Sequence, residues 1–214
     1  MNQTIISDKE DIMKLFYAPE SRAVRTAWLL NELKLKFEVV KFYIGDPKMR
    51  APEYLEKNPM GRVPILEDGN IRISESTAIA QYLVARYDND GMLSPHPESE
   101  DFPAYLQWMH FAEGMIMPPV NTIVVETILL PPEKKNDVNV ARALKLLKIA
   151  LLNVDNRLKD REYLTGVFSG ADIMTGHACY ASRRLKVDIS DMINLNQYID
   201  RLLSRTAFKK AVSL

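Results

Sequence analysis

The chain has 214 residues, 47% of them apolar, and is long enough to bury a substantial hydrophobic core. Its 28 lysine and arginine residues balance 28 aspartate and glutamate residues, so no field of either sign favours nucleic acid or an anionic membrane surface as a partner. The sequence shows no secretory signal and no apolar run of about eighteen residues, and we expect a cytoplasmic protein that does not bind membranes.

The first part of the chain alternates strands and helices. A strand is expected at residues 12–18, a helix at 19–33 and a second strand at 37–43, which the helical crossover places parallel to the first. A short helical stretch at 52–57 then precedes a hairpin and a further helix, so that the predicted order is βαβαββα. Residues 1–11 are polar and are expected to form a loose leader.

The stretch from residue 58 to residue 76 is the most informative part of the chain. The run 63–67 has the composition of a strand, but Pro64 cannot donate to a ladder and belongs at a strand start, at an edge or in a cis turn. Asp68-Gly69 is a two-residue hairpin signal that returns the chain as an antiparallel strand. Glu75-Ser76 then opens the next helix.

Beyond residue 88 the sequence predicts helices. Residues 89–97 have the composition of a linker, so we expect one domain at residues 1–88 and an all-α domain at 98–214. From about residue 138, apolar residues recur at steps of three and four, which predicts a long amphipathic helix; they are Leu144, Leu147, Leu151, Val154 and Leu158. At the start of the next helix Ser169 can act as the cap while Asp172 reaches back to it, and we assign both residues to folding.

The hairpin and the helix after it together describe a ligand site. If Pro64 turns the main chain outward, the N–H and carbonyl of Val63 can pair with an extended peptide. A helix N-terminus at Ser76 offers N–H groups and partial positive charge to an anion, while Glu75 offers a carboxylate to a cation. The site favours a zwitterionic ligand with a peptide backbone, although each dipeptide alone also fits a plain strand start or a helix cap.

In this order and spacing, these residues resemble the signature of the cytosolic glutathione S-transferases, in which a cis-proline follows a valine and a Glu-Ser pair opens the third helix. Ser21-Arg22, followed by Trp28-Leu29-Leu30, is similar to the serine-type bacterial and fungal members of that family. The likeness covers nearly the whole chain from Met13 onward. It implies the glutathione S-transferase fold, an α/β thioredoxin-like domain (βαβαββα) plus an all-α domain, and it implies a homodimer.

The resemblance also implies that a glutathione thiolate is held near the first strand–helix junction. Lowering a thiol pKa by about two units takes roughly 2.7 kcal/mol. A hydroxyl donating to the charged sulfur supplies about 1.5–3 kcal/mol and the helix dipole about 0.3–1 kcal/mol more. Ser21 is placed for both effects, Tyr17 is the second candidate for the catalytic hydroxyl, and a plain N-cap is the alternative role for Ser21.

In the binding mode that the family implies, the cysteinyl backbone of glutathione pairs with Val63, the γ-glutamyl end lies at Glu75 and Ser76, and the glycine carboxylate meets Arg62 unless that side chain is only solvated. The expected function is activation of glutathione for attack on a small hydrophobic electrophile, or for the reduction of peroxides. The alternative is a non-catalytic relative used for protein–protein interaction or regulation. No metal is expected, because Cys179 is the single cysteine and the three histidines are scattered.

Overall fold

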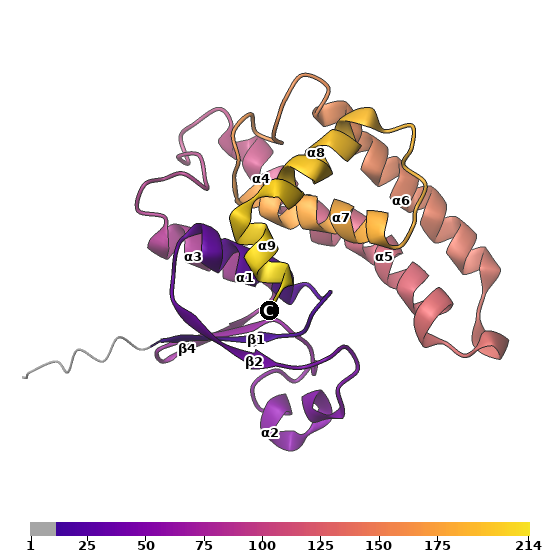
Figure 1. Ribbon diagram of the computed structural model, residues 1–214, viewed down its shortest axis with the longest axis horizontal. Helices are drawn as coiled ribbons and strands as arrows, with labels where there is room; N and C mark the ends of the chain where they lie inside the picture. The colour runs from indigo at the N-terminus through magenta and orange to yellow at the C-terminus, as the bar shows by residue number, and fades with distance from the viewer. Residues whose placement is uncertain (1–11) are drawn as a thin grey trace, which may run out of the picture.

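The computed structural model describes residues 12–214 and contains a four-stranded mixed sheet in the order β2-β1-β3-β4 (Figure 1). The strands are β1 (Met13–Tyr17), β2 (Phe37–Lys41), β3 (Ile65–Asp68) and β4 (Ile71–Ser74). β1 is parallel to β2 and antiparallel to β3, and β3 is antiparallel to β4. This topology confirms the predicted element order, while the predicted leader at residues 1–11 lies outside the described residues.

Helices cover both faces of this sheet. α1 (Ala23–Glu32) and α3 (Ser76–Tyr87) lie on one face, and the short α2 (Pro52–Leu55), which follows the turn η1 (Pro47–Arg50), lies on the other (Figure 1). Neighbouring residues of β1 point to opposite faces, so Leu15 enters the large core beneath α1 while Phe16 packs with Tyr54 of α2. The sheet is thus buried on both sides, as a thioredoxin-like domain requires.

Two boundaries differ from the prediction for this domain. α1 begins at Ala23 and not at residue 19, because Glu20 has a φ of +62° and the chain makes a turn before the helix starts. The hairpin turn consists of Gly69-Asn70 and not of Asp68-Gly69, since Asp68 still pairs with Ile71 at the end of the ladder. Gly69 supplies the positive φ, +56°, at the first turn position.

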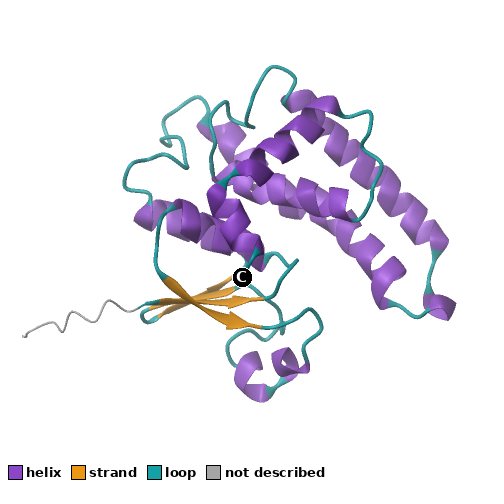
Figure 2. Cartoon of the chain, in the orientation of Figure 1, coloured by secondary structure: helices purple, strands orange, loops and turns teal. Residues whose placement is uncertain are grey.

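The remaining described residues form helices joined by loops (Figure 2). One nearly continuous rod consists of α4 (Phe102–Phe111), the π-helical η2 (Ala112–Ile116), α5 (Met117–Val124) and the π-helical η3 (Val125–Leu129). After η4 (Pro132–Lys134), α6 (Asp137–Arg157) packs antiparallel to α5. Of the predicted apolar stripe on α6, Leu144 is 39% exposed while the other four residues are buried.

The last helices connect the two domains. The buried η5 (Asp172–Gly176) and α7 (His177–Arg184) run through the helical domain, and α8 (Ile193–Ser204) leads into α9 (Thr206–Val212), which packs along α1 (Figure 1). The indole of Trp28 on α1 lies 4.9 Å from the Phe208 ring of α9 and 5.9 Å from the Phe168 ring. Its N–H donates to Glu32 at 2.8 Å, and Glu32 also accepts from Arg205 between α8 and α9.

Within residues 12–214, no helix is both long and apolar enough to cross a bilayer. The same residues bring together no group of three or more histidine, cysteine, aspartate or glutamate side chains with the geometry of a metal site. Cys179 is buried on α7, and burial raises the pKa of its thiol far above the usual value.

Candidate functional site

The sheet topology brings three predicted site segments to one edge. Phe16 of β1, Ile65 of β3 and Ser74 of β4 lie in one row across the sheet. β1 leaves the sheet beyond this row toward Ser21, β3 enters it from Val63-Pro64, and β4 leaves it toward Glu75-Ser76. We call the place where these segments meet the ligand edge, defined by residues 18–22, 62–64, 75 and 76.

The Val63-Pro64 peptide bond at the ligand edge is cis. The loop before it is fixed, since the Arg62 carbonyl accepts hydrogen bonds from Tyr54 Oη and Asn58 Nδ2, each at 2.8 Å. In the part of the chain that the structure describes, neither the N–H nor the carbonyl of Val63 has a hydrogen-bond partner. The main chain of Val63 therefore presents one donor and one acceptor, as an unpaired strand edge does.

Glu75 has an unusual backbone, with φ +75° and ψ +115° in a residue that is not glycine. Such conformations cost of order 1–3 kcal/mol and cluster at ligand-binding sites. The bend leaves the Glu75 side chain exposed and turns the chain into α3, where Ser76 is buried. The first N–H groups of α3, which have no partner within a helix, follow Glu75 directly in the chain. The ligand edge therefore carries a negative charge at Glu75 and a partial positive charge at the start of α3.

Ser21 lies in the turn between β1 and α1 and is partly exposed. Its hydroxyl donates to the Ala18 carbonyl at 2.7 Å and accepts from the Ala23 N–H at 3.1 Å. The second bond ties the oxygen to the first turn of α1, where the positive end of the helix dipole lies. Among residues 12–214, the next N–H along the chain, that of Arg22, has no acceptor. One hydroxyl and one amide without an acceptor therefore belong to the ligand edge.

The Tyr17 side chain, the second candidate for the catalytic hydroxyl, points elsewhere. It is fully buried, and its hydroxyl donates to the Ala211 carbonyl of α9 at 2.9 Å. Burial raises the pKa of this phenol above its ordinary value. The structure thus separates the two candidates, with Ser21 at the ligand edge and the Tyr17 hydroxyl in the interface between the domains. Arg62 lies at the edge with an exposed side chain.

An ionic cluster that is absent from the predictions lies next to Ser21. Glu113 of η2 accepts hydrogen bonds from Arg22 (2.6 Å) and from Arg25, and Arg25 Nε donates to Nδ1 of His177 at 3.2 Å. Burial raises the pKa of Glu113, but the two arginines outweigh it and hold that pKa below the ordinary value. Burial and then Arg25 lower the pKa of His177 well below its ordinary value, so that ring is neutral. An available signal was Arg25 in an apolar helix, since a buried arginine requires a partner.

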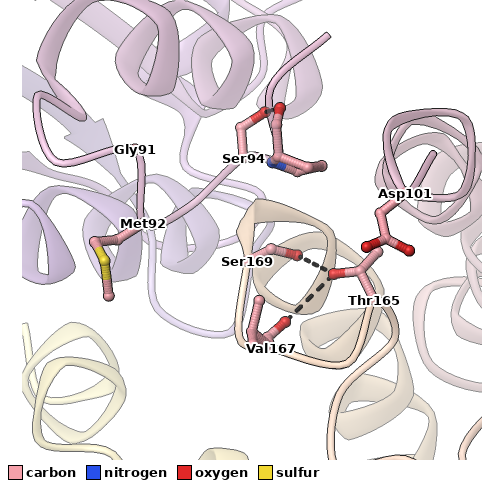
Figure 3. A pocket seen from close by; sticks show the side chains of 8 residues that line it. Gly91, Met92, Ser94, Asp101, Thr165, Val167 and Ser169 are labelled. Atoms are coloured by element: carbon pink, nitrogen blue, oxygen red, sulfur yellow. Dashed lines mark hydrogen bonds between the residues drawn. The ribbon is translucent and has the colours of Figure 1, made fainter. Parts of the chain in front are cut away.

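A small cavity of about 90 Å³ lies away from the ligand edge, between residues 91–101 and the loop before η5. Figure 3 shows the Thr165 hydroxyl bonded to the Val167 carbonyl and to the Ser169 hydroxyl at its wall. Next to this wall the Asp172 carboxylate accepts a hydrogen bond from the Ser169 N–H at 2.9 Å. The sequence predicted this bond, in which a side chain in the first turn of the helix reaches back to the residue before the helix. The Ser169 hydroxyl donates to the same carboxylate and, among residues 12–214, accepts no backbone N–H of the helix. This cavity belongs to the folding motif.

Similarity to known proteins agrees with this geometry. Residues 12–85 match the family model described as glutathione S-transferase, N-terminal domain. The chain is 28% identical to glutathione S-transferase 3 of Schizosaccharomyces pombe over 211 residues, which cover 92% of this chain and 85% of that protein. It is 31% identical to glutathione S-transferase 4 of Zea mays over 146 residues, covering 67% of this chain and 65% of that protein.

Solved structures show the same fold over almost the whole length. A glutathione transferase of Phanerochaete chrysosporium, crystallised with oxidised glutathione, superposes with a TM-score of 0.86 at 25% identity, covering 97% of this chain and 96% of that one. A glutathione transferase homologue of Lodderomyces elongisporus, crystallised with two glutathione molecules per subunit, gives a TM-score of 0.87 at 24% identity, covering 95% and 98%. The matched N-terminal domain and the curated relatives show that the chain belongs to the glutathione S-transferase family of enzymes.

Proposed function

We propose that this chain is a serine-type glutathione transferase, similar to bacterial and fungal members, that activates reduced glutathione for attack on small hydrophobic electrophiles. The observation that carries the proposal is the unpaired main chain of Val63 at the ligand edge. An extended tripeptide can supply both a carbonyl and an N–H to these groups, as an added strand does. The glutathione complexes of the Phanerochaete and Lodderomyces proteins support this choice of ligand.

Each end of glutathione has a complementary group at the ligand edge. The γ-glutamyl end carries an ammonium and a carboxylate; the first pairs with the Glu75 carboxylate and the second with the N-terminus of α3 at Ser76. The cysteinyl backbone pairs with Val63, in the position fixed by Pro64. The exposed Arg62 guanidinium is left for the glycine carboxylate. The thiol in the middle then points toward the turn that carries Ser21.

Ser21 is the catalytic residue in this proposal. Its hydroxyl gives up the bond to the Ala18 carbonyl and donates to the sulfur, which stabilises the thiolate and releases the thiol proton to water. The thiolate attacks the electrophilic carbon, a carbon–sulfur bond forms, and the leaving group departs with its electron pair. The gain comes from ionisation and from proximity of the two reactants, without a proton relay. Tyr17 contributes through packing, because its hydroxyl is already bonded to α9.

The same bound thiolate can reduce peroxides, and the alternative function is a non-catalytic relative that uses the fold for protein–protein contact or regulation. The complete ligand edge favours the enzyme, since a contact module has no need for an unpaired Val63 beside an unpaired helix N-terminus. We further propose a detoxifying role in the cytoplasm and domain limits at residues 1–88 and 98–214, with the linker at 89–97. No metal takes part in this mechanism.

The test of this function is binding and turnover by the intact protein. We expect retention on immobilised glutathione, heat of binding in calorimetry, and formation of the glutathionyl conjugate from chlorodinitrobenzene with release of chloride. Absence of both retention and heat of binding would exclude the function. Binding without turnover on chlorodinitrobenzene, on peroxides or on other electrophiles would favour the non-catalytic alternative.

Replacing Glu75 with glutamine is expected to weaken glutathione binding by about 10- to 100-fold, since one charge-assisted hydrogen bond contributes roughly 1.5–3 kcal/mol. The turnover number at saturating glutathione should change little, because Glu75 does not approach the sulfur in the proposed pose. Calorimetry and the KM for glutathione give the measurement. Glu53→Gln on α2 is the matched control, since Glu53 is exposed and lies off the ligand edge. Equal losses of glutathione affinity in Glu75→Gln and Glu53→Gln would show that Glu75 is not part of the binding site.

We also propose a homodimer. Exposed apolar side chains at helical spacing on α6 support it, because an isolated helix face seldom presents Leu146, Ile149 and Leu152 to water, at 50%, 58% and 46% exposure. The expected mass in sedimentation equilibrium at micromolar concentration is that of two chains, and Ile149→Glu should shift it toward one chain. Asn70→Glu, at an exposed residue of the β3–β4 turn, gives the same charge change away from this stripe. A wild-type protein that sediments as a single chain contradicts the dimer.

A further inference from the structure

The turn that carries Ser21 makes its long-range side-chain contacts with the other domain. On one side of Ser21, Tyr17 donates to Ala211 of α9 and Glu20 pairs with Arg184 of α7. On the other side, Arg22 and Arg25 both bond to Glu113 of η2. On both sides of the proposed catalytic residue, the thioredoxin-like domain therefore contacts the helical domain. The groups proposed to bind the ends of glutathione lie in the loop before β3, at Glu75 and at the start of α3.

Glu113 is the centre of these contacts. Each of its two carboxylate oxygens accepts from a different arginine, and the two arginines are three residues apart, Arg22 directly before α1 and Arg25 in its first turn. Arg25 is 1% exposed, whereas the side chains of Arg22 and Glu113 are 24% and 25% exposed. Glu113 also lies in a π-helical segment, a helix distortion that occurs frequently at functional sites. One carboxylate thus fixes the rotation of this helix end relative to the helical domain.

The Arg22–Glu113 pair acts on the residue next to Ser21. The peptide between Ser21 and Arg22 carries the N–H that has no acceptor within residues 12–214. A 2.6 Å charge-assisted hydrogen bond from the Arg22 side chain restricts the rotation of this peptide. The same restriction fixes the direction in which the Ser21 hydroxyl and the Arg22 N–H face the ligand edge. A second ion pair between the domains, Arg205–Glu32, lies at the other end of α1 and makes no contact with this peptide.

We propose that Arg22 and Glu113 are positioning residues for Ser21, so that ionisation of the thiol depends on the helical domain whereas affinity for glutathione depends on the thioredoxin-like domain. This inference rests on the proposed function. In this inference the Arg22–Glu113 ion pair sets the angle between the Ser21 hydroxyl and the sulfur of bound glutathione. A contact that merely held the domains together would influence stability and leave the thiol pKa unchanged.

Arg22→Gln is the variant that tests this inference, with Arg205→Gln as its control. Arg22 is chosen because removing Glu113 would leave the buried Arg25 without its counter-ion, and such proteins often fail to fold. The control is closely matched: Arg205 is 28% exposed, it bonds to a carboxylate across the domain interface, and the substitution removes the same charge. Arg22→Lys keeps a charged donor that can reach Glu113.

We expect Arg22→Gln to raise the pKa of the bound glutathione thiol, read from the ultraviolet absorbance of the thiolate, by about one unit, and to lower kcat at neutral pH by about 5- to 10-fold. The KM for glutathione should stay within about two-fold, Arg22→Lys should recover most of kcat, and Arg205→Gln should leave the thiol pKa unchanged. A higher KM with an unchanged thiol pKa overturns the inference. So does an equal effect of Arg22→Gln and Arg205→Gln.

A measurement without substrate separates this inference from the proposed function. Hydrogen exchange at the amides of Ala23 and Val24, in the first turn of α1, should be faster in Arg22→Gln than in the wild type and unchanged in Arg205→Gln. If the wild type binds no glutathione, the proposed function fails while this result still decides whether the pair positions the turn. Identical exchange in the wild type and Arg22→Gln overturns the inference, even in an active enzyme.

Discussion

Replacing Ser21 with alanine is expected to raise the pKa of the bound glutathione thiol by about one to two units and to lower kcat/KM for conjugation at neutral pH by about 10- to 100-fold. The reason is the loss of a charge-assisted hydrogen bond from a hydroxyl whose oxygen the Ala23 N–H already holds in place. A smaller fraction of bound glutathione is then ionised at a given pH, so the rise of activity with pH shifts to more alkaline values. The pH dependence of kcat/KM measures this shift.

Two control variants make the Ser21 result specific. Ser21→Thr keeps the hydroxyl and should retain much of the activity. Tyr17→Phe should leave the thiol pKa unchanged but lower the free energy of unfolding by about 1 kcal/mol, since it removes one buried hydrogen bond to Ala211. The opposite pattern, with full activity in Ser21→Ala and an alkaline shift in Tyr17→Phe, would transfer the catalytic role to the tyrosine.

Asp172→Ala is expected to lower the free energy of unfolding by about 3–5 kcal/mol, one of the largest effects available to a single substitution. The carboxylate is fully buried and accepts from three residues: Leu164 N–H at 3.0 Å, Ser169 N–H at 2.9 Å together with the Ser169 hydroxyl at 3.2 Å, and Tyr198 Oη at 2.9 Å. Alanine leaves these donors buried without an acceptor. Denaturant titration followed by circular dichroism gives the measurement, with the exposed Asp160→Ala as control.

The pH dependence of stability provides a second test of the same group. Burial raises the pKa of Asp172 to about 6, even though its hydrogen bonds act in the opposite direction. In the unfolded chain the value is about 3.9, so between these values the folded protein binds more protons than the unfolded one. The part of the stability that comes from proton binding at Asp172 is therefore complete below about pH 4 and is lost as the pH rises through about 6, while the hydrogen bonds to the carboxylate remain. Relative to Asp172→Asn, the wild type should become less stable over this interval, and a constant difference would contradict the assignment.

Local sequence patterns were sufficient to predict much of this protein. Proline geometry identified the turn at Val63-Pro64, strand and helix periodicities gave the element order, and the Ser169–Asp172 spacing identified a helix start that the structure contains. Each of these features depends on residues close together in the chain. The exact hairpin turn was wrong by one residue, because glycine is acceptable at either turn position and the cross-strand register decided between them.

Local sequence patterns could not predict contacts between residues that lie far apart in the chain. The bond from Tyr17 to Ala211 spans 194 residues and the Arg22–Glu113 pair spans 91, so no local spacing indicates either of them. These contacts decide which of the two candidate hydroxyls faces the ligand edge, and the sequence left that choice open. The positive φ of Glu75 escaped prediction for a related reason, since a glutamate has no local preference for that conformation and only the surrounding structure imposes it.

The position of Trp28 makes the junction between the domains visible by optical spectroscopy. Its indole is enclosed by Phe168 and Phe208 from the C-terminal part of the chain, whereas the second tryptophan, Trp108, packs at a tilted angle against Phe111 within α4. Separation of the two domains would bring water to the first indole and leave the second in its apolar surroundings. A red shift in the intrinsic fluorescence of a Trp108→Phe protein would therefore report domain opening before any helix unwinds.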